Sequence, residues 1–316
     1  MAPKGNRDRK GIPKFLFGSS ISKLDGPPGA PEPALSAVEG SRGEPRPARH
    51  RRRVRWAVYS GAGGPVASSP GVEPLTFANC YEDGARAEAY ATLEFKNTYH
   101  LAYRDIPAIL GAHVRGRKSI DFGCGTGRST RFLRQLGFEV TGVDIAEDMI
   151  RKARELDPSG DYRLIGSDDL SSFQSGTYDL VLAAFTFDNI GGKNNDNKVR
   201  VLRDLGQLLN REGRLVLIVS RPEIYTHEWA SFSTKDFPEN QLAKSGEKVR
   251  IIVTDHADPR PVEDIVFTDE SYREVFEEAH LRLLQKYEPL AREDEPYWWV
   301  SELRIAPWAV YVVECA

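Results

Sequence analysis

An acidic residue followed by three alternating glycines is the feature of this sequence best suited to chemistry. Asp121 ends an apolar, strand-like run, Gly123, Gly125 and Gly127 follow, and a helix-like run starts at Arg128. Glycine has no Cβ, so the backbone can turn sharply and approach a ligand closely at these positions. The carboxylate can accept hydrogen bonds from a cationic or hydroxylated ligand. The pattern predicts a ligand-binding turn between a strand and a helix.

A second carboxylate stands where it could hold a ribose. Asp144 lies 17 residues after Gly127 and ends the apolar run 138–143. An acid at the end of the second strand of such a unit can bind both ribose hydroxyls, which indicates a cofactor that carries a nucleoside. A dinucleotide fingerprint requires glycine at the sixth position, where this chain has Arg128. The alternating spacing therefore favours S-adenosylmethionine over NAD.

At this point the chain resembles the class I S-adenosylmethionine-dependent methyltransferases of the small-molecule type, over roughly residues 75–316. The family's first motif matches 121–127, its second strand 140–144, its fourth strand 178–185 and its turn before the fifth strand 209–216. The resemblance implies a doubly wound, Rossmann-like seven-stranded α/β sheet, mostly parallel with a C-terminal antiparallel strand. It also implies an enzyme that moves the methyl group of S-adenosylmethionine to a small-molecule acceptor.

The sequence departs from the family pattern in two motifs. Arg211 and Glu212 replace the usual Pro and first Gly of the late turn, which a surface can tolerate. The acid that the family places near the adenine amino group aligns with Ser167, and Asp168 and Asp169 follow it. Which of these side chains contacts the adenine is left open by the sequence.

The predicted cofactor-binding residues combine the glycine turn, the strand-end acids and their apolar neighbours. Cys124 is expected to act through its amide, with a reactive thiol as the alternative, and Ile145 and Met149 pack either on the adenine or in the core. The full set is Asp121, Gly123, Cys124, Gly125, Gly127, Asp144, Ile145, Met149, Asp168, Asp169 and Phe185.

Methyl transfer from a sulfonium is an in-line displacement, so alignment of the reactants is expected to supply most of the rate. A base is needed only if the acceptor must lose a proton. Asp188, which follows the fourth strand, and His227 and Glu228, in an aromatic-rich segment, are the predicted catalytic residues. The aromatic residues of that segment suggest an acceptor with an apolar or planar surface.

Alternation of strand and helix patterns predicts a parallel sheet with helices on both faces. Two helices, 81–95 and 98–110, are expected before the sheet, and an inserted β-hairpin, 248–254 with 262–268, inside a substrate-side insert 221–268. The expected strands are 117–121, 139–143, 161–165, 178–184, 213–219, 281–290 and 308–313, and the later helices are 127–136, 146–155, 195–209 and 268–279.

The first part of the chain has a different composition. Residues 1–60 carry 13 Lys or Arg against 5 Asp or Glu, and 11 of the 20 prolines lie in 1–74. Such a segment buries too little apolar surface to offset its ordering entropy, so 1–74 is predicted to be a disordered basic tail. A solvated tail is the simple interpretation of its arginine cluster 49–55, with nucleic-acid binding or nuclear targeting as alternatives.

Composition bounds the remaining possibilities. Three widely spaced cysteines favour a reducing, cytoplasmic location, and the six histidines form no pair with metal-ligand spacing. No apolar run reaches the length of a membrane span, and the net charge of −3 gives no general attraction to nucleic acid. The oligomeric state is left open. The competing functions are a non-catalytic S-adenosylmethionine-binding protein and a nicotinamide-dependent oxidoreductase.

Overall fold

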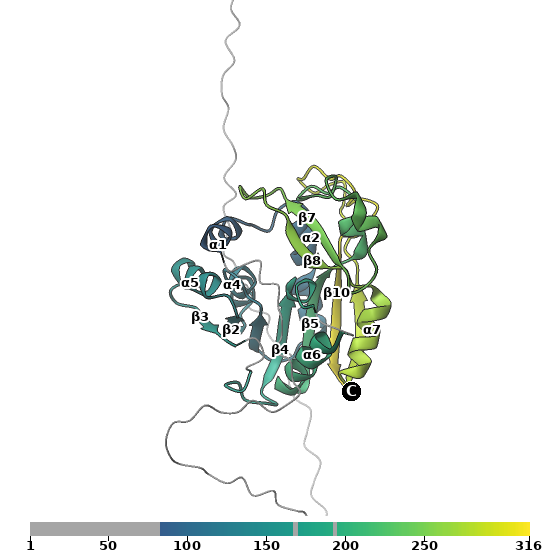
Figure 1. The fold of residues 1–316 in the computed structure, drawn as a ribbon. Helices are drawn as coiled ribbons and strands as arrows, with labels where there is room; N and C mark the ends of the chain where they lie inside the picture. Colours follow the sequence, from purple (N-terminus) through teal and green to yellow (C-terminus); the bar gives the residue numbers. More distant parts are fainter. Residues whose placement is uncertain (1–82, 167–169, 192–194) are drawn as a thin grey trace, which may run out of the picture. The chain divides into compact units, whose positions relative to one another are not determined.

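The computed structural model describes residues 83–166, 170–191 and 195–316. The predicted tail 1–74 and the candidates Asp168 and Asp169 lie outside these residues. The centre of the described domain is a seven-stranded sheet in the order β3-β2-β1-β4-β5-β10-β9 (Figure 1). Its neighbouring strands run parallel except β10, which is antiparallel to β5 and β9. The predicted fold class is confirmed.

The strands of this sheet are β1 (Lys118–Phe122), β2 (Glu139–Asp144), β3 (Asp161–Leu164), β4 (Tyr178–Ala184), β5 (Leu209–Ser220), β9 (Leu281–Tyr287) and β10 (Trp308–Cys315). The helices are α1 (Gly84–Ala91), α2 (Thr98–Arg104), α3 (Ile106–His113), α4 (Arg128–Gln135), α5 (Glu147–Leu156), α6 (Asp196–Leu208) and α7 (Asp269–Glu278). Short 3₁₀ turns include η1 (Thr186–Asp188), η3 (Pro222–Tyr225) and η4 (Pro238–Leu242).

Helices cover both faces of the sheet because successive strand side chains point to opposite sides. In β4, Leu180 and Leu182 pack in an apolar cluster with residues of α2, α3 and α4. Val181 and Ala183 pack in a second cluster with residues of α6 and α7. A central strand that is buried on both faces has to be apolar at consecutive positions, which is what 180–183 show.

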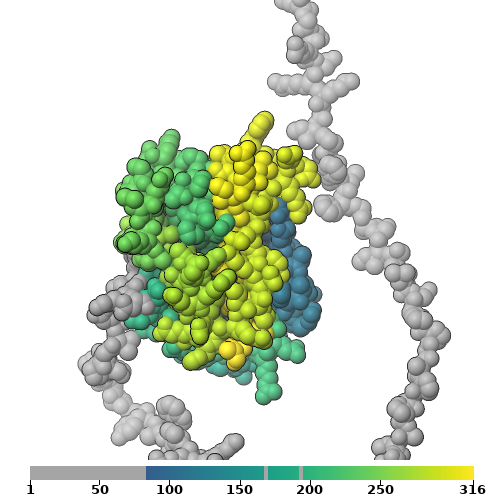
Figure 2. All heavy atoms as spheres, turned by 90° about the vertical axis from the view of Figure 1, so that its right-hand side faces the viewer, coloured from purple at the N-terminus to yellow at the C-terminus, as the bar shows by residue number. Residues whose placement is uncertain are grey.

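The insert 221–268 forms a small second sheet at the end where the parallel strands terminate (Figure 1). The predicted hairpin is present as β7 (Lys248–Val253) and β8 (Val262–Ile265), and β6 (Phe232–Ser233) adds a third strand along β7. Figure 2 shows part of the insert in green beside the yellow loop before β10. The amide of Ala230 and the Glu302 carboxylate join the two segments at 2.7 Å.

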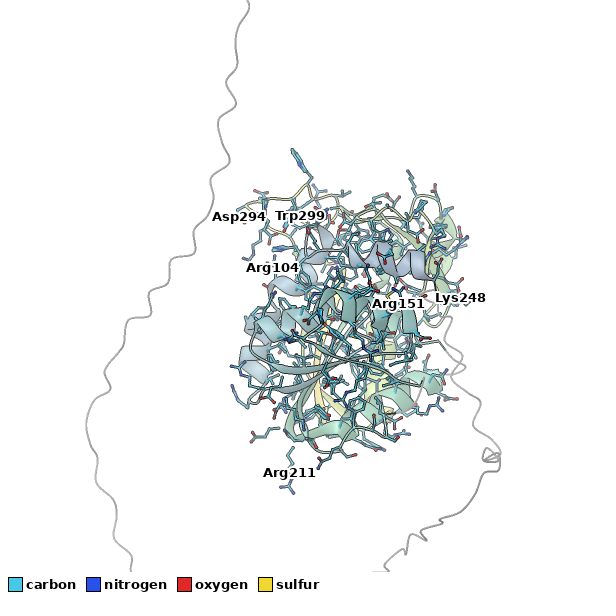
Figure 3. The ribbon with its side chains drawn as sticks, turned by 90° about the vertical axis from the view of Figure 1, so that its left-hand side faces the viewer. Arg104, Arg151, Arg211, Lys248, Asp294 and Trp299 are labelled. Atoms are coloured by element: carbon cyan, nitrogen blue, oxygen red, sulfur yellow. The ribbon has the colours of Figure 1, made fainter. Side chains whose placement is uncertain are left out.

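The two ends of the sheet differ in what covers them. In Figure 3, Arg211 marks one end, at the turn inside β5, whereas Asp294 and Trp299 mark the other. The insert and the loop before β10 therefore gather at the carboxyl ends of the parallel strands, where ligands bind in folds of this kind.

The predicted helix 98–110 is two helices, α2 and α3, which break at Asp105. Pro107 stands in the first turn of α3, where its missing N–H costs nothing and its ring prevents a continuous helix. The predicted helix 81–95 is shorter, as α1, and starts where the Asp83 carboxylate accepts a hydrogen bond from the Ala85 amide at 2.8 Å. Among the described residues, no helix is long and apolar enough to span a bilayer.

Candidate functional site

A first cavity opens at the carboxyl ends of β1, β2 and β4. It holds about 1080 Å³ of empty space, counting the solvent at its mouth. The glycine turn, the end of β2 and the segment after β4 form its walls, and α1 closes one side with Tyr90. Seven predicted cofactor-binding residues line it: Gly123, Cys124, Gly125, Asp144, Ile145, Met149 and Phe185.

The three glycines have positive φ angles for different reasons. A Cβ on Gly123 would lie 2.2 Å from the Thr186 hydroxyl, and one on Gly127 would lie 2.6 Å from the Tyr162 ring. At Gly125, φ is +53° and no protein atom lies within 4 Å of the Cβ position. Two glycines are thus required by packing inside the protein, whereas Gly125 leaves open space on the cavity side where a ligand can approach the backbone.

Asp144 holds the glycine turn and also faces the cavity. Its Oδ2 accepts a hydrogen bond from the Gly125 amide at 2.8 Å, and its Oδ1 accepts one from the Ala146 amide at 2.9 Å. Burial raises the pKa of this carboxyl, and the backbone hydrogen bonds oppose that shift. A carboxylate has about four acceptor positions, so about two remain for hydroxyl groups of a ligand. Asp144 thus holds the backbone of the turn and lines the cavity, and its contact with a ribose stays a prediction.

Asp121 does not line the cavity. The carboxylate is fully buried behind the turn, where Oδ2 accepts hydrogen bonds from Ser129 at 2.7 Å and Thr130 at 2.6 Å. These bonds fasten the first turn of α4 to the end of β1. Burial raises the pKa of Asp121 to about 6. Its Oδ1 is buried without a hydrogen-bond partner among the described residues, so its predicted contact with a cofactor stays a prediction.

The remaining cavity residues provide apolar surface. Met149 packs in a small cluster with Ala87 and Ala146, so the side of α5 that faces α1 is apolar. Burial raises the pKa of the Cys124 thiol well above its usual value, which favours an inert thiol and a role through the backbone. Phe185 takes a left-handed backbone conformation, φ +62°, directly after β4. For a bulky residue this conformation is a local strain that turns the chain away from the sheet.

Arg128 is a structural part of the site that was not among the predicted site residues. Its guanidinium lies over three aromatic rings, 4.5 Å from the Tyr99 centroid, 5.5 Å from Phe95 and 5.7 Å from Tyr103. One NH group donates to the Glu94 carbonyl at 3.1 Å. A partial signal was present in the sequence, because aromatic residues recur every four positions at 95, 99 and 103, although Phe95 lies in the bend before α2 and only Tyr99 and Tyr103 share a side of that helix.

A second cavity adjoins the first. Its empty space is about 480 Å³, again counting open solvent, and four residues line both cavities: Tyr90, Arg128, Phe185 and Asn189. Seven of its lining residues belong to the insert: Ile224, Tyr225, Phe232, Ile251, Val253, Val262 and Asp264. The insert therefore forms much of a pocket next to the first cavity, and its role as the substrate side stays a prediction.

The predicted catalytic residues fall in two places. Asp188 lines the second cavity, where its carboxylate accepts hydrogen bonds from the Ser220 amide at 3.1 Å and the Ser220 hydroxyl at 2.8 Å. His227 contacts Thr226, and the Glu228 carboxylate accepts the Thr234 amide at 2.6 Å. Neither His227 nor Glu228 lines either of these cavities. A catalytic role stays a prediction for all three residues, of which only Asp188 lines a cavity.

The residues present fit the cofactor that the sequence predicts. The turn has open space at Gly125, Asp144 keeps acceptor positions for a ribose, and Ile145 and Met149 offer apolar surface for an adenine. The buried Oδ1 of Asp121, which has no hydrogen-bond partner within the described ranges, lies in the same strand–turn–helix unit. The fold and this site together define a Rossmann-like methyltransferase domain.

Comparison with known proteins agrees with this class. Residues 120–217 match the family model described as "Methyltransferase domain", a range that includes the glycine turn, Asp144, β4 and most of β5. Residues 120–217 of the chain are therefore similar to a methyltransferase domain.

Relatives of known name cover only part of the chain. A ubiquinone biosynthesis O-methyltransferase from Bordetella avium (strain 197N) is 36% identical over 76 residues, which is 23% of this chain and 32% of that protein. A ubiquinone biosynthesis O-methyltransferase from Xanthomonas oryzae pv. oryzae (strain PXO99A) is 28% identical over 108 residues, 33% of this chain and 43% of that protein. The chain thus spans less than half the length of these relatives.

Solved structures resemble the domain at low identity. The CcbJ methyltransferase from Streptomyces caelestis is 19% identical with a TM-score of 0.47, over 68% of this chain and 96% of that one. An S-adenosylmethionine-dependent methyltransferase from Clostridium acetobutylicum is 14% identical with a TM-score of 0.49, over 75% and 100% of the two chains.

Proposed function

We propose that this protein transfers the methyl group of S-adenosylmethionine to a small-molecule acceptor. The observation that carries the proposal is the open backbone of Gly125 directly beside the cavity-facing Asp144 carboxylate, joined to it at 2.8 Å. This pairing suits a ligand with an amino-acid end and a ribose. When bound, S-adenosylmethionine supplies a methyl group on a positively charged sulfur, which is already a strong electrophile.

The chain's own residues have the tasks of binding, orienting and excluding water. The glycine turn and Asp144 hold the nucleoside part, and Tyr90 and Phe185 line the wall that both cavities share. Fixing two reactants in line at short distance removes much of the entropic barrier of a bimolecular step. Asp188 is the proposed proton acceptor where the acceptor has to lose a proton, while its bonds to Ser220 limit its freedom to move.

The names of the relatives support oxygen as the acceptor atom, because those listed above are O-methyltransferases. The matched part is mainly the cofactor half, so the insert that shapes the second cavity has to determine the acceptor. We also propose a cytoplasmic location, which the wide spacing of the three cysteines supports.

Calorimetric titration of the purified protein tests the cofactor. S-adenosylhomocysteine, the demethylated product, should bind, and NAD should not, because the turn has Arg128 where the dinucleotide motif needs its third glycine. Tight NAD binding without any response to S-adenosylhomocysteine would contradict the proposal.

Turnover separates an enzyme from a non-catalytic binding protein. Incubation with methyl-labelled S-adenosylmethionine and a metabolite extract should transfer the label to small molecules. Binding of the cofactor without transfer to any compound in a broad set of acceptors would favour the binding protein.

A further inference from the structure

The second cavity has an apolar wall and a polar floor. Its wall contains six aromatic side chains, and Tyr99 and Trp308 stack in it with ring centroids 6.0 Å apart at an angle of 22°. Phe185 and Phe232 pack against the same indole at 4.8 and 5.6 Å. Such walls favour a flat, apolar ligand, since aromatic rings gain most from offset or edge contacts with other planar groups.

Asp264 breaks the apolar pattern of this cavity. Inward positions of β7 and β8 carry Val249, Ile251, Val253 and Val262, yet the next inward residue of β8 is Asp264, which is 8% exposed. A buried carboxylate among β-branched residues costs free energy that packing does not return. A position of this kind, where the local pattern is violated, is where a ligand-binding role is expected.

One oxygen of Asp264 is held and the other is free. Oδ2 accepts a hydrogen bond from the Tyr225 hydroxyl at 3.1 Å. Within the described parts of the chain, no group donates to Oδ1, and the residue lines the cavity. A hydrogen-bond donor on a ligand that enters the cavity can therefore reach an acceptor that the fold has already oriented.

The charges around Asp264 disfavour a cationic ligand. Lys198, which is 2% exposed, lies near enough to lower the pKa of Asp264 by its charge, and it also interacts with Asp188. Arg128 adds a second positive group to the cavity wall. Burial, then the Asp188 charge, raises the pKa of Asp264, and Glu263 contributes in the same direction. Lys198 already accompanies the two buried carboxylates, and the cavity wall carries the further positive charge of Arg128, so an uncharged donor fits better than an ammonium.

We propose that the second cavity binds the methyl acceptor, and that this acceptor is an uncharged phenol. The Asp264 carboxylate accepts a hydrogen bond from the phenol's hydroxyl group. This inference rests on the proposed function, which it deepens by naming an acceptor class and a specificity residue. Tyr225 positions the carboxylate, the aromatic wall holds the ring, and the neighbouring cavity places the cofactor beyond Phe185 and Asn189.

Binding of matched probes to the full chain tests this assignment. The probes are 2-naphthol, its methyl ether 2-methoxynaphthalene, and a naphthylmethylammonium ion, each titrated with S-adenosylhomocysteine present. The measurement uses tryptophan fluorescence at several values between about pH 7 and pH 9, a range that spans the pKa of Asp264, which burial raises to about 8, and that stays below the pKa of a phenolic hydroxyl, about 10. The variants are Asp264→Asn, which keeps the shape, and the control Glu263→Gln. Glu263 is the adjacent residue of β8, and its carboxylate pairs with Lys248 at 2.5 Å instead of lining the cavity.

We expect that only Asp264→Asn loses the preference for 2-naphthol over its methyl ether. In the wild type, 2-naphthol should bind at least about tenfold more tightly than the ether, because a hydrogen bond to a charged acceptor is worth more than a neutral one. Asp264→Asn should remove most of this preference, while Glu263→Gln keeps it and both variants bind S-adenosylhomocysteine as the wild type does.

Other results would overturn the assignment and remain separable from a failure of the proposed function. Equal binding of naphthol and ether, an unchanged preference in Asp264→Asn, tighter binding of the ammonium, or no naphthyl binding beside normal S-adenosylhomocysteine binding would each refute it. Absence of S-adenosylhomocysteine binding in the wild type would instead refute the proposed methyltransferase activity, on which the inference depends.

Discussion

Gly125→Ala should weaken cofactor binding without destroying the fold. The residue has φ +53°, and a Cβ there meets no protein atom within 4 Å. The left-handed conformation of a non-glycine residue costs about 1–2 kcal/mol, which a domain of this size tolerates. The new methyl group would project into the first cavity, where overpacking against a bound ligand costs about 1–3 kcal/mol. That range corresponds to roughly a 5- to 150-fold rise in the dissociation constant.

Gly176→Ala is the matched control because it carries the same strain at a site away from the cavity. Gly176 has φ +68°, nothing lies within 4 Å of its Cβ position, and it is exposed in the turn before β4. Both variants should lose similar stability in a denaturant melt without ligand. Only Gly125→Ala should lose affinity for S-adenosylhomocysteine in a calorimetric titration. Equal affinities in the two variants would show that no ligand approaches the backbone at Gly125, and the reasoning for the cavity would fail.

Two further predictions concern the strand-end acids. Asp144→Ala should lower the free energy of unfolding by about 1–3 kcal/mol for each amide left without its acceptor. It should also weaken S-adenosylhomocysteine binding at least about tenfold, because the ribose contacts are lost. A loss of stability with unchanged affinity would leave Asp144 with only the capping role. Asp121 is fully buried with its folded-state pKa raised from 3.8 to about 6, so the folded protein holds this proton more tightly than the unfolded chain. Stability should therefore fall as pH rises from about 4 to about 6, by about 3 kcal/mol from this group, and Asp121→Asn should remove that part; superimposable pH profiles of the two proteins in urea melts would contradict the shift.

Much of the fold follows from patterns that the sequence carries locally. Strand β4 is recognisable because a strand buried on both faces needs consecutive apolar residues. The glycine turn is recognisable because few other sequences allow three positive φ angles in five residues. The split between α2 and α3 was missed although Pro107 marks it. The two-residue strand β6 has no periodicity to detect, so only its pairing with β7 defines it.

The parts of the candidate site that come from one motif were predictable. The parts that need contacts between residues far apart in the sequence were not. Gly125 and Asp144 lie in adjacent strand–turn units, so spacing alone placed them together. Tyr225 and Asp264 are 39 residues apart and meet only because the hairpin folds its inward side over the cavity. For Asp121 the motif predicted the position but not the hydrogen-bond partners. Ser129 and Thr130 reach its carboxylate only because α4 packs against the end of β1.

The side chains that line both cavities have a consequence for how the two ligands sense each other. Tyr90, Arg128, Phe185 and Asn189 contribute to each cavity, so a molecule that shifts one of these side chains from one cavity changes the wall of the other. Linkage makes this effect reciprocal, with each ligand changing the other's affinity by the same factor. The wall between the two cavities is thereby a direct physical route by which binding in one cavity can affect binding in the other within a single domain.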